Sequence, residues 1–470
     1  MGETMHIAVV GSGYVGLVAG TCFGELGHTV ILVDNDQAKV QALKCGEVPI
    51  HEQFLPELLA RHRGTRLSFT DDLGEAVRAS DAIFIAVGTP PTEDGEADLS
   101  YVESVARGIA GSISSYKVVV EKSTVPVYTS DWIRKVMLLN GAPPGMFDVA
   151  SNPEFLREGS AVTDFLFPDR IVIGADSLRC AEVLRKAYAP LVDGEYYRQD
   201  NAVPKPDHAR VPPPLISTSA KSAELIKHAS NAFLAMKISF INAVASICES
   251  VGANVEQVVE GIGSDSRIGP RFLSPGIGYG GSCFPKDLMA FYSVARDCGY
   301  DFRLLHEVMR INEEQRSRYL RKVRKALWTL KGKRLAVLGL AFKGGTDDIR
   351  ESPAIALVKA LLKEGAQVVA YDPAAMERAA EVLPAQHITY SRSAYEAVDT
   401  ADALLILTDW EEFTALDLDR LYASLRYPIV IDGRNLYDPE IMAERGLIYF
   451  SIGRPDAIPE KRAALTLKAA

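Results

Sequence analysis

Cysteine is scarce in this sequence, and its few cysteines form no metal-binding or disulfide pattern. The chain has six cysteines in 470 residues, and no two of them form a Cys-x-x-Cys pair. Neither a disulfide framework nor a zinc knuckle is therefore indicated. We expect most of these thiols to be core residues and one of them, Cys283, to have a chemical role.

The sequence also lacks an excess of positive charge. Its 51 Lys and Arg residues stand against 61 Asp and Glu residues, which gives a formal net charge of -10. A protein that binds nucleic acid needs a basic face, so no nucleic-acid partner is expected. An anionic substrate would instead need a local group of Lys and Arg side chains.

A targeting segment is missing as well. No basic region and no cleavable apolar segment precede the strand-like residues 6–10, so we expect a cytoplasmic protein. The hydrophobic content of 47% and the charged content of 24% are typical of a soluble globular chain. Because single cores rarely grow beyond about 250–300 residues, a chain of this length should contain two or three domains.

Short apolar runs alternate with helical patterns in two parts of the chain, which is typical of strand-helix-strand units around a parallel sheet. The predicted strands are residues 6–10, 29–33, 82–87, 118–120 and 171–173 in the first part, and 334–338, 367–371, 403–408 and 429–432 in the second. We predict domains at 1–215, 216–328 and 329–455, with a tail at 456–470. The stretch 193–214 and the tail have the weakest structural pattern.

Residues 222–251 contain no Gly and no Pro and predict one long helix that ends at Gly252. The helix is apolar on nearly every side, so we expect a partner subunit to cover part of it and predict a homodimer or higher homo-oligomer. A membrane span is the alternative. Four residues break the apolar run and argue against a membrane: Lys227, His228, Asn231 and Lys237.

A dinucleotide-binding pattern follows the first predicted strand. Gly11 permits a tight turn, Gly13 lets the backbone approach a pyrophosphate, and Gly16 lets the next helix pack on the strand. Asp34 ends the second strand, where its carboxylate would accept hydrogen bonds from the adenosine ribose and repel the 2′-phosphate of NADP. We therefore predict NAD as the cofactor. Lys39 can reach the same region, although a solvated lysine explains it equally well.

Cys283 differs from the other cysteines because glycines precede it and Pro285 follows it. A proline at this position suits the first turn of a helix, which places the thiol at a helix N-terminus and favours a thiolate nucleophile. Asp287 lies four residues on, on the same predicted face. Lys227 and Asn231 are likewise four apart on the long helix and are suited to stabilise an oxyanion. Taken singly, each of these residues also fits an ordinary structural role.

The second lobe begins similarly but does not repeat the dinucleotide pattern. Its first strand leads into Gly339 and then Lys343, so we do not expect a second NAD site. Lys343, Arg350 and Arg434 follow strands and can compensate the charge of a nucleotide diphosphate. The predicted fold class is therefore α/β, with two Rossmann-like doubly wound lobes joined by a long central helix and a small helical domain.

Motifs along nearly the whole chain resemble those of the UDP-glucose/GDP-mannose dehydrogenase family. They occur, in order, at residues 11–16, 87–90, 122–126, 152–159, 224–227, 280–287, 339–343 and 432–434. Residues 282–287 are most similar to members of this family that oxidise UDP-glucose. The resemblance implies an NAD-dependent double oxidation of a sugar C6 alcohol to a carboxylate, through a thiohemiacetal and a thioester on the cysteine.

The resemblance also implies a role for individual residues. Cys283 is the nucleophile, Lys227 and Asn231 stabilise oxyanions, Asp287 handles a proton with water, Glu154 is the base for thioester hydrolysis and Thr124 positions a water. The NAD-binding residues implied are Gly11, Gly13, Tyr14, Val15, Gly16, Asp34, Lys39, Thr89, Thr124, Glu158, Lys286 and Arg350. The substrate-binding residues implied are Glu154, Phe155, Leu156, Lys227, Asn231, Arg267, Phe272, Leu273, Ser274, Gly276, Gly280, Phe342, Lys343 and Arg434. Arg267 is similar to a residue that reaches a neighbouring subunit's site. No metal is implied.

Three features depart from the pattern of this family. Tyr128 stands where a glycine is usual, which suggests a different turn after Thr124. Gly344 and Gly345 replace a more usual Pro or Asn pair, which would loosen the loop beside Lys343. The stretch 193–214 is longer than in many relatives.

Three alternative functions fit parts of the sequence. A two-electron hydroxyacid or 6-phosphogluconate-type dehydrogenase would share the first lobe and the long helix but needs no catalytic thiol. A sugar-nucleotide epimerase is disfavoured because no Tyr is followed four residues later by Lys. A non-catalytic nucleotide-sugar sensor would be expected to have lost the Cys, Lys and Asp constellation, which is present here.

Overall fold

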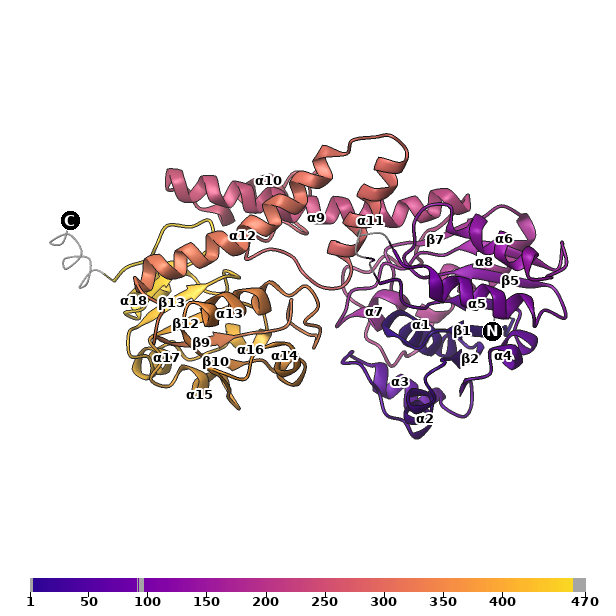
Figure 1. The fold of residues 1–470 in the computed structure, drawn as a ribbon, viewed down its shortest axis with the longest axis horizontal. Helices are drawn as coiled ribbons and strands as arrows, with labels where there is room; N and C mark the ends of the chain where they lie inside the picture. Colours follow the sequence, from indigo (N-terminus) through magenta and orange to yellow (C-terminus); the bar gives the residue numbers. More distant parts are fainter. Residues whose placement is uncertain (1–2, 91, 93–96, 460–470) are drawn as a thin grey trace. The chain divides into compact units, whose positions relative to one another are not determined.

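The computed structural model describes residues 3–90, 92 and 97–459, and the chain divides into two compact units (Figure 1). Unit 1 comprises Met1–Ser230 with Met289–Tyr300, and unit 2 comprises Asn231–Leu288 with Asp301–Ala470, over the described residues. The helices α9 (Ala220–Val251) and α11 (Phe284–Asp297) therefore contribute residues to both units. The division into three domains and a tail stays a prediction.

Unit 1 is built on an eight-stranded sheet in the order β3-β2-β1-β4-β5-β6-β7-β8. All neighbours pair in parallel except β6 and β7, so β7 and β8 run opposite to the rest. The strands are β1 (His6–Val10), β2 (Thr29–Val33), β3 (Leu67–Thr70), β4 (Ala82–Ile85), β5 (Lys117–Glu121), β6 (Phe147–Ser151), β7 (Ile171–Ala175) and β8 (Leu215–Thr218).

Helices cover both faces of this sheet, which explains why its central strands are almost continuously apolar. In β1, Ile7 and Val9 point into one core cluster, while Ala8 and Val10 point into the other. The first cluster is covered by α1 (Tyr14–Glu25), α2 (Gln37–Cys45), α3 (Leu55–His62), α7 (Ala161–Leu166) and α8 (Leu178–Val192), and the second by α4 (Leu73–Ala79), α5 (Ser100–Ala110) and α6 (Thr129–Leu139).

Unit 2 contains a six-stranded, all-parallel sheet in the order β11-β10-β9-β12-β13-β14. Its strands are β9 (Arg334–Leu338), β10 (Gln367–Tyr371), β11 (Ile388–Tyr390), β12 (Ala403–Ile406), β13 (Ile429–Asp432) and β14 (Ile448–Phe450). The order matches that of the first six strands of unit 1, which is the doubly wound order of dinucleotide-binding folds. The predicted α/β fold class with two such lobes is confirmed.

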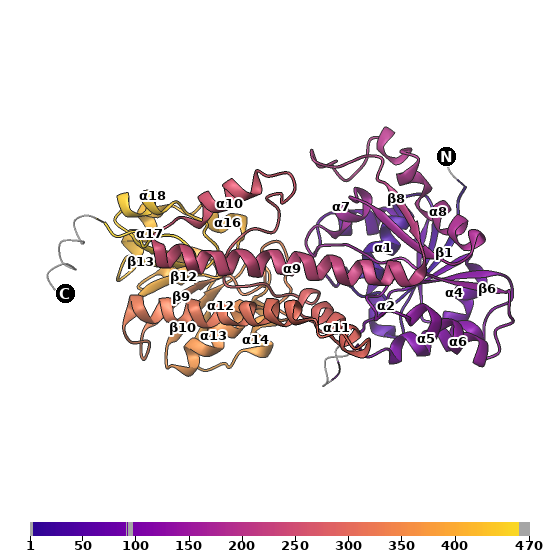
Figure 2. The same ribbon diagram turned by 90° about the horizontal axis from the view of Figure 1, so that it is seen from above.

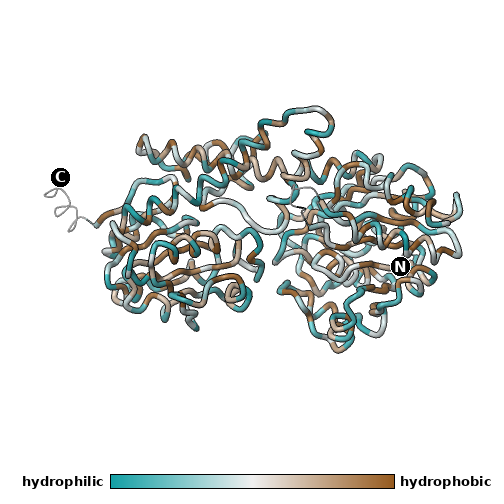
Figure 3. Tube along the Cα trace, in the orientation of Figure 1, coloured by the Kyte–Doolittle hydropathy of each residue, from teal (hydrophilic) through white to brown (hydrophobic). Residues whose placement is uncertain are grey.

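The helices of unit 2 also lie on both faces of its sheet. On the first face of the sheet, α9 packs together with α10 (Val255–Gly263), α12 (Arg303–Leu327), α13 (Pro353–Lys363) and α14 (Met376–Val382). The second face is covered by α15 (Ala394–Val398), α16 (Glu411–Thr414), α17 (Leu418–Ser424) and α18 (Pro439–Glu444). Figure 2 shows α9 as one unbroken helix, and Figure 3 shows apolar residues (brown) gathered in the interior of each unit.

Several predicted boundaries need correction. The strands predicted at 82–87 and 403–408 end two residues earlier, at Ile85 and Ile406, because the chain leaves the sheet there to form the turns at its carboxyl edge. Stretch 193–214 has irregular backbone with one short 3-10 turn, Tyr196–Arg198, yet it is packed rather than weakly structured. Tyr196 and Val203 are buried in the core of unit 1.

The first residues of the predicted tail, 456–459, belong to the described part of the chain. Asp456 forms an ion pair with Lys325 at 3.0 Å, and Ala457 makes an isolated bridge with Tyr449. Residues 460–470 of the tail lie outside the described residues. The first residues of the tail are therefore attached to unit 2.

Candidate active site

The glycine-rich turn between β1 and α1 has the geometry that a dinucleotide requires. Gly11 has a φ of 98°, and a Cβ there would lie 2.7 Å from the carbonyl oxygen of Ala86; a Cβ on Gly16 would lie 1.8 Å from the carbonyl oxygen of Gly11. These two glycines are required by the packing of the protein itself. A Cβ on Gly13 would meet nothing within 4 Å, so Gly13 leaves open space before the N-terminus of α1, where a pyrophosphate binds.

Asp34 lies at the carboxyl end of β2, beside this turn. Its carboxylate accepts hydrogen bonds from the Ser12 backbone nitrogen at 2.9 Å and from the Ser12 hydroxyl at 2.6 Å, and Lys39 Nζ lies 3.3 Å away. Burial raises its pKa, but the Ser12 hydrogen bonds and Lys39 outweigh burial, so the pKa of Asp34 is below its ordinary value. An ionised carboxylate at this position fits NAD and repels the extra phosphate of NADP.

Two threonines lie where β4 and β5 end, at the same carboxyl edge. The Thr89 hydroxyl donates to the carbonyl oxygen of Thr124 at 2.8 Å, which joins the two turns. The ring of His228, on α9, is hydrogen-bonded through Nε2 to the carbonyl oxygen of Val125 at 2.7 Å. His228 thus fixes the backbone beside Thr124, a role that the sequence did not indicate.

Glu154 and Lys227 form a buried ion pair in unit 1. Lys227 Nζ donates to Glu154 Oε1 and to the Glu154 carbonyl oxygen, both at 2.7 Å, and the Leu156 backbone nitrogen donates to Glu154 Oε2 at 2.5 Å. Both side chains are about 95% buried, with exposed fractions of 4% and 5%. Burial raises the pKa of Glu154, but the charge and hydrogen bond of Lys227, the backbone hydrogen bond of Leu156 and the charge of Lys122 together hold that pKa below its ordinary value. The predicted base is therefore ionised at neutral pH.

A second buried lysine supports the loop that carries Glu154. Lys122 Nζ donates to the Asn152 side-chain oxygen at 3.0 Å, and the hydroxyl of Tyr188 donates to the same oxygen at 2.6 Å. Burial lowers the pKa of Lys122 to about 8, against the opposing effect of Glu154 and Glu121. In the sequence, Lys122 stands out only as the first residue of the motif at 122–126. Its contacts show that it fixes the first residue of the loop 152–159.

Cys283 immediately precedes α11 in unit 2, as predicted. Its carbonyl oxygen accepts the Asp287 backbone nitrogen at 2.9 Å, and Pro285 is the second residue of the helix. Asp287 is buried, and Asn231 Nδ2 donates to its Oδ2 at 2.5 Å. Asp287 Oδ1 lies 3.6 Å from Lys286 Nζ and accepts no hydrogen bond within the described part of the chain. This oxygen can accept a proton or a hydrogen bond from water.

Glu154, Lys227, Asn231 and Asp287 form two separate pairs, which the sequence did not indicate. Lys227 and Asn231 were predicted to act together, because they lie four residues apart on α9. Lys227 instead contacts Glu154 within unit 1, and Asn231 contacts Asp287 within unit 2. Each predicted oxyanion donor is therefore paired with a carboxylate, which sets its orientation.

The glycines before Cys283 make close contacts within the protein itself. A Cβ on Gly276 would lie 2.9 Å from the carbonyl oxygen of Gly433; on Gly280, 2.3 Å from that of Glu351; and on Gly281, 2.8 Å from the ring of Phe342. These glycines let the loop pack against the turns of the C-terminal sheet. The backbone nitrogen of Gly281 also donates to the carbonyl oxygen of Arg350 at 3.0 Å. The thiol is thus carried by a loop anchored to the second sheet.

The cations predicted to compensate a diphosphate are already engaged in protein contacts. Arg434 donates through Nε to the carbonyl oxygen of Leu407 at 2.9 Å and through Nη2 to that of Phe342 at 2.8 Å, and burial lowers its pKa. Arg350 forms a bidentate pair with Asp348, although its side chain is 60% exposed. Lys343 Nζ lies 5.5 Å from the centre of the Phe342 ring. Arg434 therefore holds the Phe342 turn in place.

The other predicted substrate residues lie in both units. In unit 1, the ring of Phe155 is covered by the guanidinium of Arg170 at 3.7 Å. In unit 2, Arg267 is 87% exposed and forms an ion pair with Asp265 at 2.6 Å. Phe272 has a φ of 65°, Leu273 is buried, and Ser274 is exposed. Leu273 thus belongs to the core of unit 2.

Tyr128, where the family pattern has glycine, adopts a backbone conformation that favours glycine. Its φ is 80°, which costs a non-glycine residue about 1–2 kcal/mol. The conformation is held by Glu224, on α9, whose carboxylate accepts the Tyr128 and Ser130 backbone nitrogens at 2.8 and 2.9 Å. Glu224 therefore holds the turn after Thr124 in this conformation.

The second departure from the family pattern, the pair Gly344 and Gly345, does not loosen the loop beside Lys343. A Cβ on Gly344 would lie 2.6 Å from the carbonyl oxygen of Asp409, and its backbone nitrogen donates to Asp409 Oδ1 at 2.9 Å. Gly345 has a φ of 78°. Close packing requires glycine at 344, and the positive φ favours glycine at 345, so the expected looseness is corrected.

Asp372 corresponds to Asp34 in the second lobe, but its surroundings differ. The carboxylate accepts the backbone nitrogens of Leu340 and Ala341 at 2.7 and 3.0 Å, and it also accepts the indole nitrogen of Trp410 at 3.2 Å. Its side chain is fully buried. Trp410 therefore occupies the acceptor that a ribose would use in a dinucleotide site.

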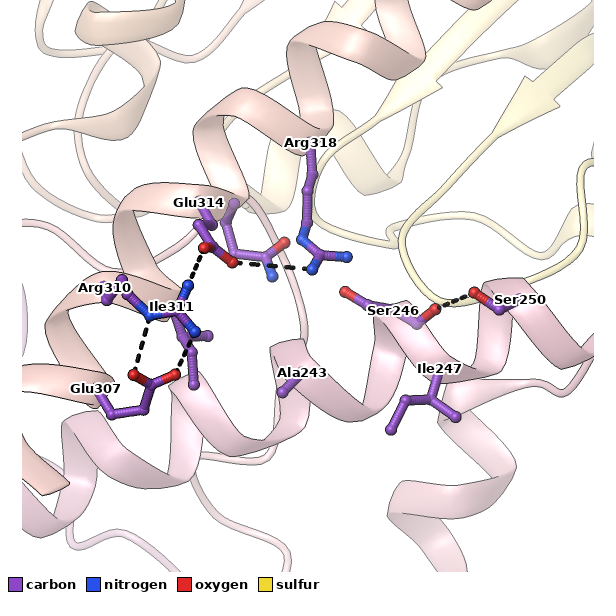
Figure 4. Close-up of a pocket in the computed structure, with 10 residues that line it drawn as sticks. Ala243, Ser246, Ile247, Ser250, Glu307, Arg310, Ile311, Glu314 and Arg318 are labelled. Atoms are coloured by element: carbon purple, nitrogen blue, oxygen red, sulfur yellow. Dashed lines mark hydrogen bonds and ion pairs between the residues drawn. The ribbon is translucent and has the colours of Figure 1, made fainter.

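A shallow cavity lies between α9 and α12 in unit 2, away from the residues described above (Figure 4). Its volume is about 470 Å³. Arg310 lines it and pairs with Glu307 and Glu314, while Arg318 lies 3.9 Å from Glu314. These charges are paired with one another, and the cavity contains no predicted catalytic residue.

The chain matches models of three domains of one family. Residues 5–192 match the NAD binding domain of the UDP-glucose/GDP-mannose dehydrogenase family. Residues 221–314 match its central domain, and residues 336–439 match its UDP binding domain.

Individual relatives are similar over nearly their full length. A UDP-glucose 6-dehydrogenase of Rhizobium meliloti is 48% identical, covering 96% of this chain and 100% of the relative. The UDP-glucose 6-dehydrogenase TuaD of Bacillus subtilis is 46% identical, covering 96% and 93%. The structure of a UDP-glucose dehydrogenase from Pyrobaculum islandicum superposes with a TM-score of 0.85 at 38% identity, covering 97% of this chain and 99% of that one.

Proposed function

We propose, since the chain belongs to the UDP-glucose/GDP-mannose dehydrogenase family, that it oxidises the C6 alcohol of UDP-glucose to the carboxylate of UDP-glucuronate. The observation that carries the proposal is the 48% identity to a UDP-glucose 6-dehydrogenase over the whole of that relative. The position of Cys283 at the start of α11 supports it, because an oxidation that continues past the aldehyde needs a nucleophile to hold the carbon.

The residues of unit 1 fit NAD. The open space at Gly13, the N-terminus of α1 and the ionised Asp34 match a pyrophosphate and an unphosphorylated ribose. We propose that Thr89 and Glu158 also contact the cofactor. NAD supplies the hydride acceptor for both oxidations, so two NAD are consumed per sugar.

We propose that Cys283 carries the carbon between the two oxidations. Its thiolate sulfur bonds to the aldehyde carbon, and the resulting thiohemiacetal oxygen is negatively charged until it gains a proton. The amide of Asn231 and the ammonium of Lys227 stabilise that charge, and Asp287 holds the proton through water. Loss of the second hydride leaves a thioester between Cys283 and the sugar acid.

Hydrolysis of the thioester completes the proposed reaction. Glu154 takes a proton from water, the hydroxide adds to the carbonyl carbon, and the carbon–sulfur bond breaks to return the Cys283 thiolate. Thr124 positions this water. The balance is one alcohol, one water and two NAD giving one carboxylate, two NADH and three protons.

Measuring NADH per sugar tests this function. We expect NADH from UDP-glucose, with two NADH formed per sugar consumed, and little from UDP-N-acetylglucosamine or GDP-mannose at equal concentration. Selective use of one of the other two sugars would assign a different substrate within the family. One NADH per sugar would refute the thioester route, because that route requires both oxidations before release.

We also propose that the chain forms a homodimer or higher homo-oligomer through α9. By length and composition α9 is the one described helix that qualifies as a membrane span, but buried ionic and polar contacts of Glu224 and Lys227 indicate a core helix. Phe233, Phe240 and Ile247 are 58%, 54% and 61% exposed. Their seven-residue spacing places them on one face, and an exposed apolar stripe of this kind marks an interface.

Replacing Phe240 with Asp should dissociate the oligomer, because a buried unpaired carboxylate strongly opposes association. The measurement is the molar mass in solution by light scattering after size exclusion. Leu178→Asp, which also places a charge on an exposed apolar residue but lies on α8, is the matched control. An unchanged mass for Phe240→Asp at low micromolar concentration would refute the proposed interface.

We also propose a cytoplasmic location for the protein.

A further inference from the structure

Glu52 is a buried carboxyl that the proposed mechanism does not use. It lies between α2 and α3, and only 4% of the residue is exposed. Buried carboxyls are rare unless they are paired or hydrogen-bonded, so the contacts of Glu52 need an explanation.

The contacts of Glu52 join two functional segments of unit 1. Glu52 Oε2 accepts the backbone nitrogen of Gly159 at 2.8 Å and also accepts the hydroxyl of Tyr14. The Tyr14 oxygen lies 2.7 Å from the same Gly159 nitrogen and accepts from it. Burial raises the pKa of Tyr14, so its hydroxyl keeps the proton that it donates.

The two segments come from distant parts of the sequence. Tyr14 is the first residue of α1, directly after Gly13 of the dinucleotide turn. Gly159 has a φ of 82° and ends the loop 152–159, which also carries Glu154 and Glu158. The loop contains no helix and no strand, so its geometry depends on such contacts.

We infer that Glu52 is a positioning residue, which clamps the loop carrying Glu154 and Glu158 onto the dinucleotide turn through Tyr14 and Gly159. The inference rests on the proposed NAD-dependent function and deepens it. The turn itself is fixed by the packing of Gly11 and Gly16, so loss of Glu52 loosens the loop and not the turn. The nicotinamide half of the cofactor should lose affinity, while the ADP-ribose half should not.

Binding measurements on Glu52→Ala test this inference without relying on turnover. We expect the Kd for NADH, followed by its fluorescence, to rise about fivefold, with the Kd for ADP-ribose unchanged within about twofold. Glu52→Gln keeps an acceptor oxygen and should restore most of the NADH affinity. Glu57→Gln, an exposed glutamate five residues away on α3, is the matched control. An equal loss of affinity for both ligands would overturn the inference, because it would indicate general disruption of the site.

A double-mutant comparison tests the pairing with Tyr14. If Tyr14 and Glu52 act as one unit, Tyr14→Phe combined with Glu52→Ala should weaken NADH binding no more than Glu52→Ala alone. Fully additive losses would overturn the proposed clamp. Neither measurement involves a sugar, so failure of the UDP-glucose assignment would leave these results interpretable.

Discussion

Replacing Cys283 with Ser is expected to lower turnover of UDP-glucose by at least about 10³-fold, because a neutral hydroxyl is a far weaker nucleophile than a thiolate. The position at the N-terminus of α11 favours the thiolate of Cys283, and a serine hydroxyl gains little from that position at neutral pH. The measurement is steady-state NADH formation under saturating UDP-glucose and NAD.

The binding of both ligands should survive this substitution, because the side-chain volume hardly changes. The Kd values for NADH and for the UDP-sugar product are expected to stay within about threefold of the wild type. Cys298→Ser is the matched control, since Cys298 is an exposed free cysteine just after α11 and has no proposed role. Wild-type turnover in Cys283→Ser would contradict the assignment of the nucleophile.

Replacing Glu154 with Gln is expected to stop the reaction at the thioester. The amide cannot take a proton from water, so steady-state turnover should fall by about 10²–10⁴-fold, the usual contribution of a general base. The two oxidations do not need this base, so each active site should still release a burst of two NADH. Mass spectrometry of the quenched protein should find the sugar acid attached to Cys283.

The pH dependence of hydrolysis follows from the ion pair. Because the pKa of Glu154 lies below its ordinary value, the base stays ionised through neutral pH and is lost only as pH falls through that lowered pKa. The ordinary pKa of a glutamate is about 4.3. Protonation of Glu154 should therefore not slow hydrolysis in the wild type between pH 8 and 6.

A burst with no covalent adduct in Glu154→Gln would refute the role of Glu154.

Much of the fold follows from local sequence pattern. The bounds of β1, β2, β9, β10 and β13 agree with the prediction, because apolar runs between turn residues are typical of buried parallel strands. The start of α11 was predictable from Pro285, because a proline suits the first turn of a helix. The dinucleotide turn was predictable because the spacing of its glycines between a strand and a helix is a local pattern.

The partners of buried polar groups were less predictable. Lys227 and Asn231 are neighbours on α9, and the sequence alone suggested a common role, but each pairs with a carboxylate from another segment. Lys227 and Glu154 are 73 residues apart in sequence. Such pairs depend on which loops the sheets bring together, and no local pattern encodes that choice.

The glycines before Cys283 show the same limit. The glycines at 276, 278, 280 and 281 stand out in the sequence, but the sequence does not show which groups approach them. Only the packed structure places the carbonyl of Gly433 against Gly276 and the ring of Phe342 against Gly281.

The sequence by itself determined the two doubly wound lobes, the cofactor turn and the helix start behind Cys283, because backbone stereochemistry and hydrophobic periodicity act over a few residues. The tertiary structure alone decided that Lys227, Lys122 and the Leu156 backbone keep Glu154 ionised, that Glu52 joins Tyr14 to Gly159 and that Arg434 holds the Phe342 turn. These choices depend on burial and charge between distant segments, which exist only once the chain has packed.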